Sequence, residues 1–399
     1  MRRKLLAAIA VAVISLAALL YLASRPAVPA LSAQTGAMAV PATEQTSAPE
    51  TTEGTTLPPA TGQTQPPDPI AELAASMTLE EKVGQLFLAR CPETDGAGEA
   101  ARFHLGGFLL FGRDFENQTP DSIRCIIASY QEAAKIPLLI AVDEEGGTVC
   151  RVSCYRAFRG ERFASPRQLY SQGGMELVFS METEKARLLN GLGVNVNMAP
   201  VCDITTQSSA FMYQRSLGQS PEIVGDFVSG AIARMAQEGV GAVMKHFPGY
   251  GNNTDTHTGI AVDKRSLTEL ESADLQPFYS GIRAGGGAIL ISHTIVEAID
   301  GSFPASLSPA AHRYLRLSMG FDGVIMTDDL SMDAIADQYG VGEAAVLAVL
   351  AGNDLLCSTE YAAQYEAVLE ACRNGRISQE ILDEAVCHVL RWKKGLNLL

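Results

Sequence analysis

The stretch Leu138-Leu139-Ile140-Ala141-Val142-Asp143-Glu144-Glu145 shows the pattern that decides the fold of this chain. Its five consecutive apolar residues are too few for a buried helix and predict a strand covered on both faces, as in a parallel sheet. Three carboxylates follow immediately, so the end of the strand carries side chains that can bind a ligand or take part in catalysis. Seven further apolar runs repeat the pattern: Val83–Leu88, Gly107–Phe111, Val194–Pro200, Val240–Phe247, Ala288–Ser292, Gly323–Thr327 and Asn353–Cys357.

Helical patterns separate these runs. Thr119 and Pro120 supply a cap and a first-turn proline, Ser220 and Pro221 do the same further on, and Gly239 supplies a stop signal. Eight strand–helix alternations predict an α/β fold, specifically a (β/α)8 barrel of the TIM type. A doubly wound open sheet is the competing fold, but no G-x-G-x-x-G sequence follows the first run.

Polar groups follow nearly every predicted strand. Beyond the first example they are Asn195, Asn197, Asp203, Lys245, His246, His293, Asp328, Asp329, Asn353 and Asp354. Each one alone is more often a helix cap or a loop charge than a catalytic group. The carboxyl ends of barrel strands nevertheless share one catalytic face, so we expect these side chains to gather around one mouth.

The N-terminal segment predicts export. Arg2-Arg3-Lys4 precedes an uncharged apolar run, Leu5–Ser24, whose length suits a membrane-spanning anchor slightly better than a cleaved signal peptide. Val28-Pro29-Ala30 offers a cleavage site, so residues 1–30 are expected to be either a signal peptide or a signal-anchor helix. Basic residues ahead of the run place the N-terminus in the cytoplasm and the remainder outside. The protein is therefore expected on the extracellular face of the cell membrane, or secreted.

The rest of the chain divides into a linker and one domain. Residues 31–69 are rich in Thr, Pro and Ala without apolar periodicity, which predicts a disordered linker, and residues 70–399 are the expected catalytic barrel. Thirty Lys and Arg oppose 45 Asp and Glu, a net charge of −15, which argues against nucleic acid as a partner and limits expected membrane contact to the N-terminal segment. Eight scattered cysteines predict neither a disulfide scaffold nor a zinc motif.

Six motifs in order carry a family resemblance. They are Asp143-Glu-Glu-Gly-Gly-Thr-Val-Cys-Arg151, Asn195-Val-Asn-Met-Ala-Pro-Val-Cys-Asp203, Arg215-Ser-Leu-Gly218, Lys245-His-Phe-Pro-Gly-Tyr-Gly251, Asp255-Thr-His257 and Thr327-Asp-Asp-Leu-Ser-Met332. Together they resemble glycoside hydrolase family 3, and within it the single-domain β-N-acetylhexosaminidases. The resemblance covers essentially all of residues 70–399. It implies a retaining enzyme, monomeric and without metal or organic cofactor, acting on glycans that contain N-acetylglucosamine, such as cell-wall fragments.

The resemblance also implies roles for individual residues. It assigns Asp328 as nucleophile, His257 with Asp255 as the acid/base dyad, and as sugar contacts Asp143, Arg151, Arg215, Lys245 and His246. The residue types suit these roles, because a carboxylate at a strand end can attack an anomeric carbon and histidine titrates near neutral pH. In an extended segment, Asp255 and His257 project to the same side. A structural ion pair remains the alternative for Arg215.

Three positions depart from the family pattern. Tyr250 stands where histidine is usual, and Glu144 and Thr148 replace the usual glutamine and arginine. The nucleophile and the dyad are unaffected, but Tyr250 and Thr148 leave details of sugar specificity open.

Several other functions remain open from the sequence. His246, Asp255, His257 and Asp328 also suit a metal-dependent barrel hydrolase, although no His-x-His stands at the first strand. The adjacent carboxylates Asp328 and Asp329 suit a mechanism assisted by the substrate's own acetamide. A β-glucosidase-like enzyme of the same family and a non-catalytic module that binds cell-wall glycan complete the alternatives.

Overall fold

The computed structural model describes residues 68–251 and 261–399. Its centre is a sheet of eight strands in the order β11-β9-β7-β6-β3-β2-β1-β12, and neighbouring strands with a recorded register run parallel. The strands are β1 (Phe87–Arg90), β2 (Gly107–Leu110), β3 (Leu139–Val142), β6 (Val196–Asn197), β7 (Gly241–Phe247), β9 (Ala288–Ile291), β11 (Val324–Thr327) and β12 (Leu356–Ser358).

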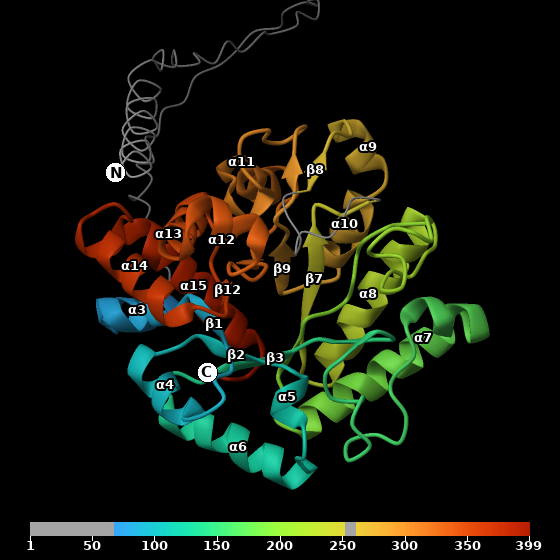
Figure 1. Cartoon of the computed structure of the whole chain (residues 1–399), viewed down its shortest axis with the longest axis horizontal. Helices are drawn as coiled ribbons and strands as arrows, with labels where there is room; N and C mark the ends of the chain where they lie inside the picture. Colours follow the sequence, from blue (N-terminus) through green and yellow to red (C-terminus); the bar gives the residue numbers. More distant parts are fainter. Residues whose placement is uncertain (1–67, 252–260) are drawn as a thin grey trace, which may run out of the picture. The chain divides into compact units, whose positions relative to one another are not determined.

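The two edges of this sheet meet. Met326 of β11 forms a parallel bridge with Leu355, immediately before β12. The Thr327 N–H donates to the Leu355 carbonyl at 3.1 Å. The sheet therefore closes into a barrel, and the predicted (β/α)8 fold is confirmed (Figure 1).

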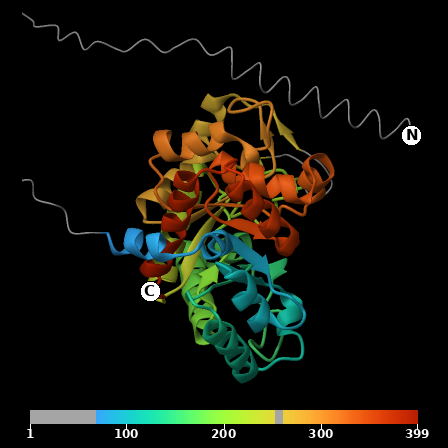
Figure 2. The ribbon, with the colours of Figure 1, turned by 90° about the vertical axis from the view of Figure 1, so that its left-hand side faces the viewer.

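Helices surround the barrel between successive strands. They are α2 (Pro69–Ser76), α3 (Leu79–Gln85), α4 (Gly96–Phe103), α5 (Gly112–Phe115), α6 (Pro120–Ala133), α7 (Pro166–Gly191), α8 (Pro221–Gln237), α9 (Leu267–Ser272), α10 (Leu275–Arg283), α11 (Pro309–Arg313), α12 (Asp333–Tyr339), α13 (Val341–Ala351), α14 (Tyr361–Arg373) and α15 (Gln379–Gly395). Although far apart in sequence, α2 and α15 pack side by side (Figure 2).

The expected helix boundaries are confirmed. Thr119 caps α6 and forms a capping box with Ser122, and Pro120 is its first residue. Ser220 precedes α8, and Gly239, with φ of 72°, ends it in the left-handed region.

Two short strand pairs lie beside the barrel. The antiparallel pair β4 (Glu144–Gly146) and β5 (Val149–Cys150) follows β3 directly. The parallel pair β8 (Val262–Asp263) and β10 (Ile295–Val296) lies after β7 and β9. The first of these pairs holds the segment after Asp143 in a hairpin.

The buried apolar side chains form two main layers. One fills the barrel interior and includes Leu88, Leu109, Val243 and Met326, with Trp392 of α15 packed against them. The larger layer lies between the strands and the surrounding helices. Successive strand residues alternate between these layers, as the apolar runs predicted.

The first predicted strand was placed wrongly. Val83, expected to start it, belongs to α3, and β1 runs from Phe87 to Arg90. Thr78 and Glu81 form a capping box that starts α3, so Val83 lies on the buried face of a helix. The strand consequently ends in Arg90, which lies beyond the predicted run.

The fourth predicted strand is much shorter than Val194–Pro200. Only Val196 and Asn197 belong to β6. The Asn195 side chain extends the pairing, since its Oδ1 accepts from the Ile140 N–H at 2.8 Å and its Nδ2 donates to the Leu138 carbonyl at 3.0 Å.

In the described ranges no single helix has the length and hydropathy to cross a membrane, and α12 and α13 meet that test only when counted together as a sharply bent pair. The predicted segment 1–30 and residues 31–67 of the predicted linker 31–69 lie outside the described residues, as do Asp255 and His257. The end of that linker was placed two residues too late, because Asp68 caps α2 and Pro69 is its first residue.

Candidate active site

A cavity of about 480 Å³ opens among the carboxyl ends of the barrel strands. Six of the eight predicted site residues line it: Asp143, Arg151, Arg215, Lys245, His246 and Asp328. They come from distant parts of the sequence, so the fold alone brings them together. The other two, Asp255 and His257, lie outside the described residues, and their placement stays a prediction.

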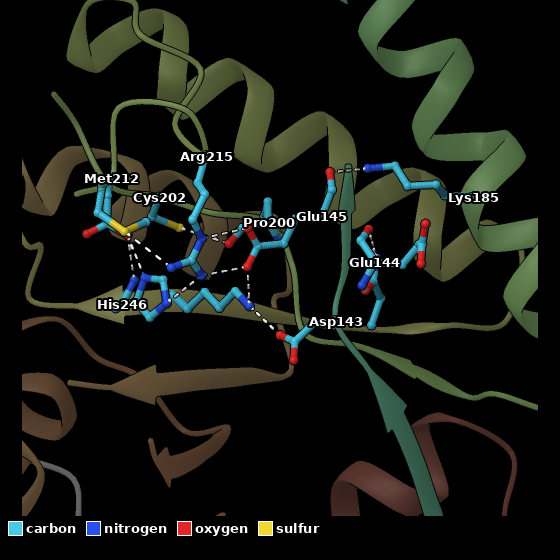
Figure 3. A network of polar contacts seen from close by, with 12 residues as sticks. Asp143, Glu144, Glu145, Lys185, Pro200, Cys202, Met212, Arg215 and His246 are labelled. Atoms are coloured by element: carbon cyan, nitrogen blue, oxygen red, sulfur yellow. Dashed lines mark hydrogen bonds and ion pairs between the residues drawn. The ribbon is translucent and has the colours of Figure 1, made fainter. Parts of the chain in front are cut away.

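The segment after β3 carries two carboxylates toward the cavity. Lys245 Nζ lies 2.6 Å from Asp143 Oδ1 and 2.6 Å from Glu145 Oε1. Glu144, between the two acids, lies on the other side of the strand (Figure 3). Its side chain is fully buried and accepts from the backbone N–H groups of Arg151 and Val152 at 2.9 and 2.8 Å. Glu144 therefore holds the β4–β5 hairpin.

Arg215 binds Glu145 through two nitrogens. Its Nε donates to Oε2 at 2.9 Å and its Nη2 to Oε1 at 2.7 Å, the geometry of a strong guanidinium–carboxylate pair. Arg215 thus makes the ion pair considered as its alternative role, and it also lines the cavity. Figure 3 shows Arg215, Glu145 and Asp143 as parts of one polar network.

Burial and charge oppose each other in this network. Burial raises the pKa of Glu145, but Lys245 and Arg215 outweigh it and hold this pKa far below its usual range. Burial lowers the pKa of Lys245, but Asp143 and Glu145 outweigh it, and the net shift is upward. Glu145, Lys245 and Arg215 are therefore charged at neutral pH, and the site presents their fixed charges without having to titrate.

This network predicts a large stability effect. Glu145→Gln should lower the free energy of unfolding by about 3 kcal/mol or more, because Lys245 and Arg215 remain buried without their shared anion. The stability contributed by a carboxylate with a lowered pKa is present above its unfolded value and is lost only as pH falls through the folded value. The difference between the variant and the wild type in the free energy of unfolding, measured with urea, should therefore be constant from pH 5 to 8.

The control for this prediction is an exposed pair of the same chemistry. Glu343 accepts from both Nη atoms of Arg376, but the two side chains are 45% and 43% exposed. Glu343→Gln should therefore cost less than about 1 kcal/mol. Equal losses for the two variants would contradict the claim that burial makes the Glu145 network strong.

His246 is held between Asp203 and Arg215. Arg215 Nη2, which can only donate, lies 3.2 Å from His246 Nε2, so Nε2 accepts. The proton is then on Nδ1, which donates to Asp203 Oδ2 at 2.7 Å. Asp203 is fully buried and also accepts from the Tyr250 N–H at 2.7 Å. Asp203 therefore fixes both the tautomer and the orientation of His246.

Tyr250, one of the departures from the family pattern, is buried in the cavity wall. Its ring packs edge-on against His246, with centroids 5.3 Å apart, and against Phe211 at 5.9 Å. Thr148 is exposed in the turn between β4 and β5 and does not line the cavity. Of the two positions that leave specificity open, only Tyr250 therefore contacts the site.

Asp328 follows the last residue of β11 and faces the cavity. Its backbone N–H donates to the Ile291 carbonyl at 3.1 Å, and its Oδ1 accepts from the Asp329 N–H at 2.9 Å. The helix that follows, α12, is capped by Met332, so neither aspartate has the capping role considered for it. Asp329 instead accepts from the Ser331 N–H at 2.9 Å and also bonds Thr359.

Several polar residues at predicted strand ends have structural roles. Asn197 accepts from the Glu144 N–H at 3.0 Å, and His293 contacts the Asp329 carbonyl at 3.0 Å, so both hold cavity-lining loops. Asn353 and Asp354 were expected at the mouth, but they precede β12 and therefore lie at the opposite end of the barrel. Polar residues mark both ends of such a strand, and sequence alone does not separate the ends.

Sequence reasoning gave no role to three residues of the site. Glu145 was detectable, since alternation along an extended segment puts it on the side of Asp143. Asp203 lies 43 positions before His246, and no local pattern links the two. Arg90 was missed because the first strand was placed too early.

In the described part of the chain, no group of three or more His, Cys, Asp or Glu side chains is arranged to hold a metal ion. His246 directs its two ring nitrogens to Asp203 and Arg215. The arrangement that the described residues do form is a set of hydrogen-bond donors and acceptors around one cavity, with an aspartate at its rim. Such a barrel mouth is suited to bind a polar, hydroxylated ligand.

The profile of the glycosyl hydrolase family 3 N terminal domain matches residues 78–392. The chain is 31% identical over 335 residues to the β-hexosaminidase LpqI of Mycobacterium tuberculosis (strain ATCC 25618 / H37Rv), covering 81% of this chain and 84% of that protein. It is 34% identical over 269 residues to the β-hexosaminidase of Xylella fastidiosa (strain M12), covering 64% of this chain and 77% of that protein. The chain belongs to glycoside hydrolase family 3.

Solved structures of family members are similar to this chain as well. The glycoside hydrolase family 3 β-N-acetylglucosaminidase from Paenibacillus sp. str. FPU-7 superposes with a TM-score of 0.75 at 33% identity, covering 81% of this chain and 63% of that protein. The structure of M. tuberculosis LpqI gives a TM-score of 0.74 at 30% identity, covering 81% and 96%. The predicted family resemblance is confirmed.

Proposed function

We propose that this chain is a retaining β-N-acetylhexosaminidase that removes terminal N-acetylglucosamine from glycans, with cell-wall fragments as the natural substrates. The observation that carries the proposal is the position of Asp328. It directly follows β11 and faces the same cavity as Asp143, Arg215 and Lys245. The names of the relatives, β-hexosaminidases and a β-N-acetylglucosaminidase, support the substrate class.

The proposed mechanism has two steps. In the first, an Asp328 oxygen attacks the anomeric carbon and forms a glycosyl ester, while the His257 imidazolium gives its proton to the departing oxygen. In the second, water attacks the same carbon, neutral His257 accepts the proton from this water, and Asp328 leaves as a carboxylate. Asp255 stabilises the imidazolium form. No step uses a metal or an organic cofactor.

The remaining predicted contacts bind and orient the sugar. Asp143 accepts hydrogen bonds from hydroxyls, while Arg151, Arg215 and Lys245 donate to hydroxyls or to an acetamide oxygen. His246 has its Nδ1 proton committed to Asp203, so the ring adds a fixed surface to the binding site. Asp143, Arg215, Lys245 and His246 are already held by buried partners, so this part of the binding site is ordered before the sugar arrives.

A substrate panel tests this function. Nitrophenyl β-glycosides that differ only at the 2-position should be hydrolysed with a kcat/KM at least tenfold higher for the 2-acetamido sugar than for glucose, roughly what one well-placed polar contact supplies. Faster hydrolysis of the glucoside would favour a β-glucosidase. Glycan binding without turnover would favour a binding module, and loss of activity with chelators would favour a metal-dependent hydrolase.

We also propose that residues 1–30 direct export of the enzyme, either as a membrane anchor that stays attached or as a signal peptide that is cleaved. The barrel then acts outside the cytoplasm as a monomer. A soluble fragment should then be as active as the whole chain, because the N-terminal segment lacks core-forming periodicity. The fragment should begin at Gln65, since Asp68 caps α2 and lies 2.9 Å from Arg391 of α15. Normal kcat/KM and a single monomeric peak in light scattering are expected, whereas an inactive fragment beside an active whole chain would refute this division.

A further inference from the structure

A cluster of three charged residues, the Arg265 cluster, lies outside the active-site cavity. Arg265 binds two carboxylates, since its Nη2 lies 2.6 Å from Asp263 Oδ2 and its Nη1 lies 2.5 Å from Asp274 Oδ2. The side chains of Asp263 and Asp274 are only 2% and 3% exposed. None of the three residues lines the cavity, and the proposed mechanism gives them no role.

Two elements hold this cluster. Asp263 is the last residue of β8, and Asp274 directly precedes α10. Asp263 Oδ1 accepts from the backbone N–H of Arg265 at 2.9 Å, so the short turn after β8 is closed by the same carboxylate that binds the guanidinium. Asp274 stands at the N-cap position of α10, but its side chain does not cap this helix and binds Arg265 instead.

The cluster packs directly against the backbone of the turn Gly249–Gly251. A Cβ atom on Gly249 would lie 2.7 Å from Asp274 Oδ1, and a Cβ atom on Gly251 would lie 2.7 Å from Arg265 Cζ. Arg265 Nη2 also donates to the Gly249 carbonyl at 3.4 Å. The turn therefore rests on the Arg265 cluster, with no space for a side chain between them.

This turn belongs to the wall of the active site. The N–H of Tyr250 donates to Asp203 Oδ1 at 2.7 Å, and its ring packs against His246. The turn also comes directly before residues 252–260, which include the predicted acid His257. The Arg265 cluster thus touches the chain just before this segment and is itself supplied by the chain just after it.

One cation shared by two buried carboxylates is a strong restraint, because loss of the cation leaves buried charge uncompensated. Burial raises the pKa of Asp274 to about 6, although the Arg265 guanidinium lowers it. The charged form of Asp274 therefore depends on Arg265. Without this guanidinium, the Asp274 carboxyl should bind a proton and lose its tie to the turn after β8.

We propose that Arg265, together with Asp263 and Asp274, is a positioning residue that fixes the turn Gly249–Gly251 for catalysis. It touches neither the sugar nor the reacting atoms. This inference rests on the proposed function, because it takes His257, six residues after the turn, to be the general acid. A displaced turn should therefore impair proton delivery more than sugar binding.

The leaving group of the substrate tests this role. Arg265→Gln should lower kcat/KM for an alkyl N-acetylglucosaminide about 10- to 100-fold, the cost of a small misplacement of a reacting group. The nitrophenyl glycoside should lose less than about threefold, because its leaving group needs little help from an acid. The inhibition constant of free N-acetylglucosamine should stay unchanged, since the cluster does not line the sugar-binding cavity.

Amide hydrogen exchange tests the position of the turn without any turnover. The N–H of Gly249 donates to the His246 carbonyl at 2.8 Å, and the N–H of Tyr250 donates to Asp203, so both should exchange slowly in the wild-type protein. In Arg265→Gln these two groups should exchange about tenfold faster or more, because the turn opens locally with less cost. Mass spectrometry of the peptide that contains the turn measures this change.

The matched control is Arg316→Gln. Arg316 Nη2 lies 2.6 Å from the buried Asp354, and its side chain is 20% exposed, compared with 31% for Arg265. This pair lies at the opposite end of the barrel, so its loss should lower stability without changing the turn or the ratio of alkyl to nitrophenyl hydrolysis. Arg265→Lys is a second variant that keeps the charge. An ammonium lacks the planar fork, so the same shifts should appear but be smaller.

Unchanged exchange at the turn in both Arg265 variants would overturn the inference. Equal losses on the alkyl and nitrophenyl glycosides, or the same change of ratio in Arg316→Gln, would also overturn it, because the effect would then be one of general stability. Failure of the proposed function gives a different result, since the wild-type protein would hydrolyse neither glycoside. Exchange at the turn would still decide whether Arg265 holds it.

Discussion

Asp328→Ala is expected to lower kcat/KM at least ~10³-fold, the scale seen when one member of a covalent catalytic unit is removed. The carboxylate supplies the attacking oxygen, and nothing in alanine replaces it. A fluorinated N-acetylglucosamine derivative that slows release of the ester should leave a covalent adduct on the wild-type peptide Thr327–Met332. Steady-state kinetics of the variant check the fall in kcat/KM, and mass spectrometry of the wild-type peptide checks the covalent adduct.

The control for Asp328 is Asp333, the first residue of α12. It lines the same cavity and carries the same charge, but it is exposed and has no part in the proposed mechanism. Asp333→Asn should change kcat/KM by less than about threefold, the scale of an exposed charge acting through solvent. An adduct on another peptide, or tight binding of an oxazoline-type inhibitor with no adduct, would favour the substrate-assisted mechanism.

His257→Ala is expected to have the second largest effect, and the size of the effect should depend on the leaving group. A general acid contributes about 10²- to 10⁴-fold when the departing oxygen needs a proton. Hydrolysis of an alkyl glycoside or a natural glycan should therefore fall by this factor. The first step on a nitrophenyl glycoside should suffer far less, because nitrophenolate leaves with little help.

The second step should then limit the variant. Water has lost its base, so the glycosyl-enzyme should accumulate, and a burst of nitrophenol should precede slow turnover. Azide needs no base and should accelerate turnover with formation of a β-glycosyl azide. Asp255→Asn should shift both measurements in the same direction but more weakly, since the imidazole remains. Equal losses on alkyl and aryl substrates, with no effect of azide, would place the acid elsewhere.

If His257 is not the general acid, the two remaining candidates are Asp329 and Glu144, and the structure favours Asp329. Glu144, the other, is fully buried and occupied by the backbone of the β4–β5 hairpin. Asp329 lines the cavity, although its oxygens also bond Ser331 and Thr359. The structure thus narrows a choice that the sequence left open.

Sequence predicted the barrel well because the strands are short, apolar and evenly repeated. It placed β2, β3, β7, β9 and β11 to within about a residue or two. The strand β1 was misplaced because Val83 satisfies a helix face and a strand equally well, and only the capping box before it distinguishes the two. The strand β6 was overestimated because asparagine side chains, rather than backbone groups, make part of its pairing.

The candidate site was predictable where the place of a residue along its own strand is enough to bring it to the cavity. Asp328 and Lys245 follow directly from their places at strand ends. Pairings between side chains were not, because Asp203 and His246 come from different strand–helix units and meet only when β6 and β7 lie side by side. The approach of Arg265 to Gly251 is likewise visible only in three dimensions, since no sequence pattern links the two.

Closure of the sheet also determines when this protein can finish folding. Phe87 of β1 pairs with Leu356 of β12, and more than half of the chain separates them. Contacts between such distant residues are slow to form because a long loop must close first. Until the last strand has left the ribosome, β1 and β11 both expose unpaired edges, which are templates for aggregation. Expression truncated before Leu356 should therefore yield insoluble protein rather than a smaller barrel.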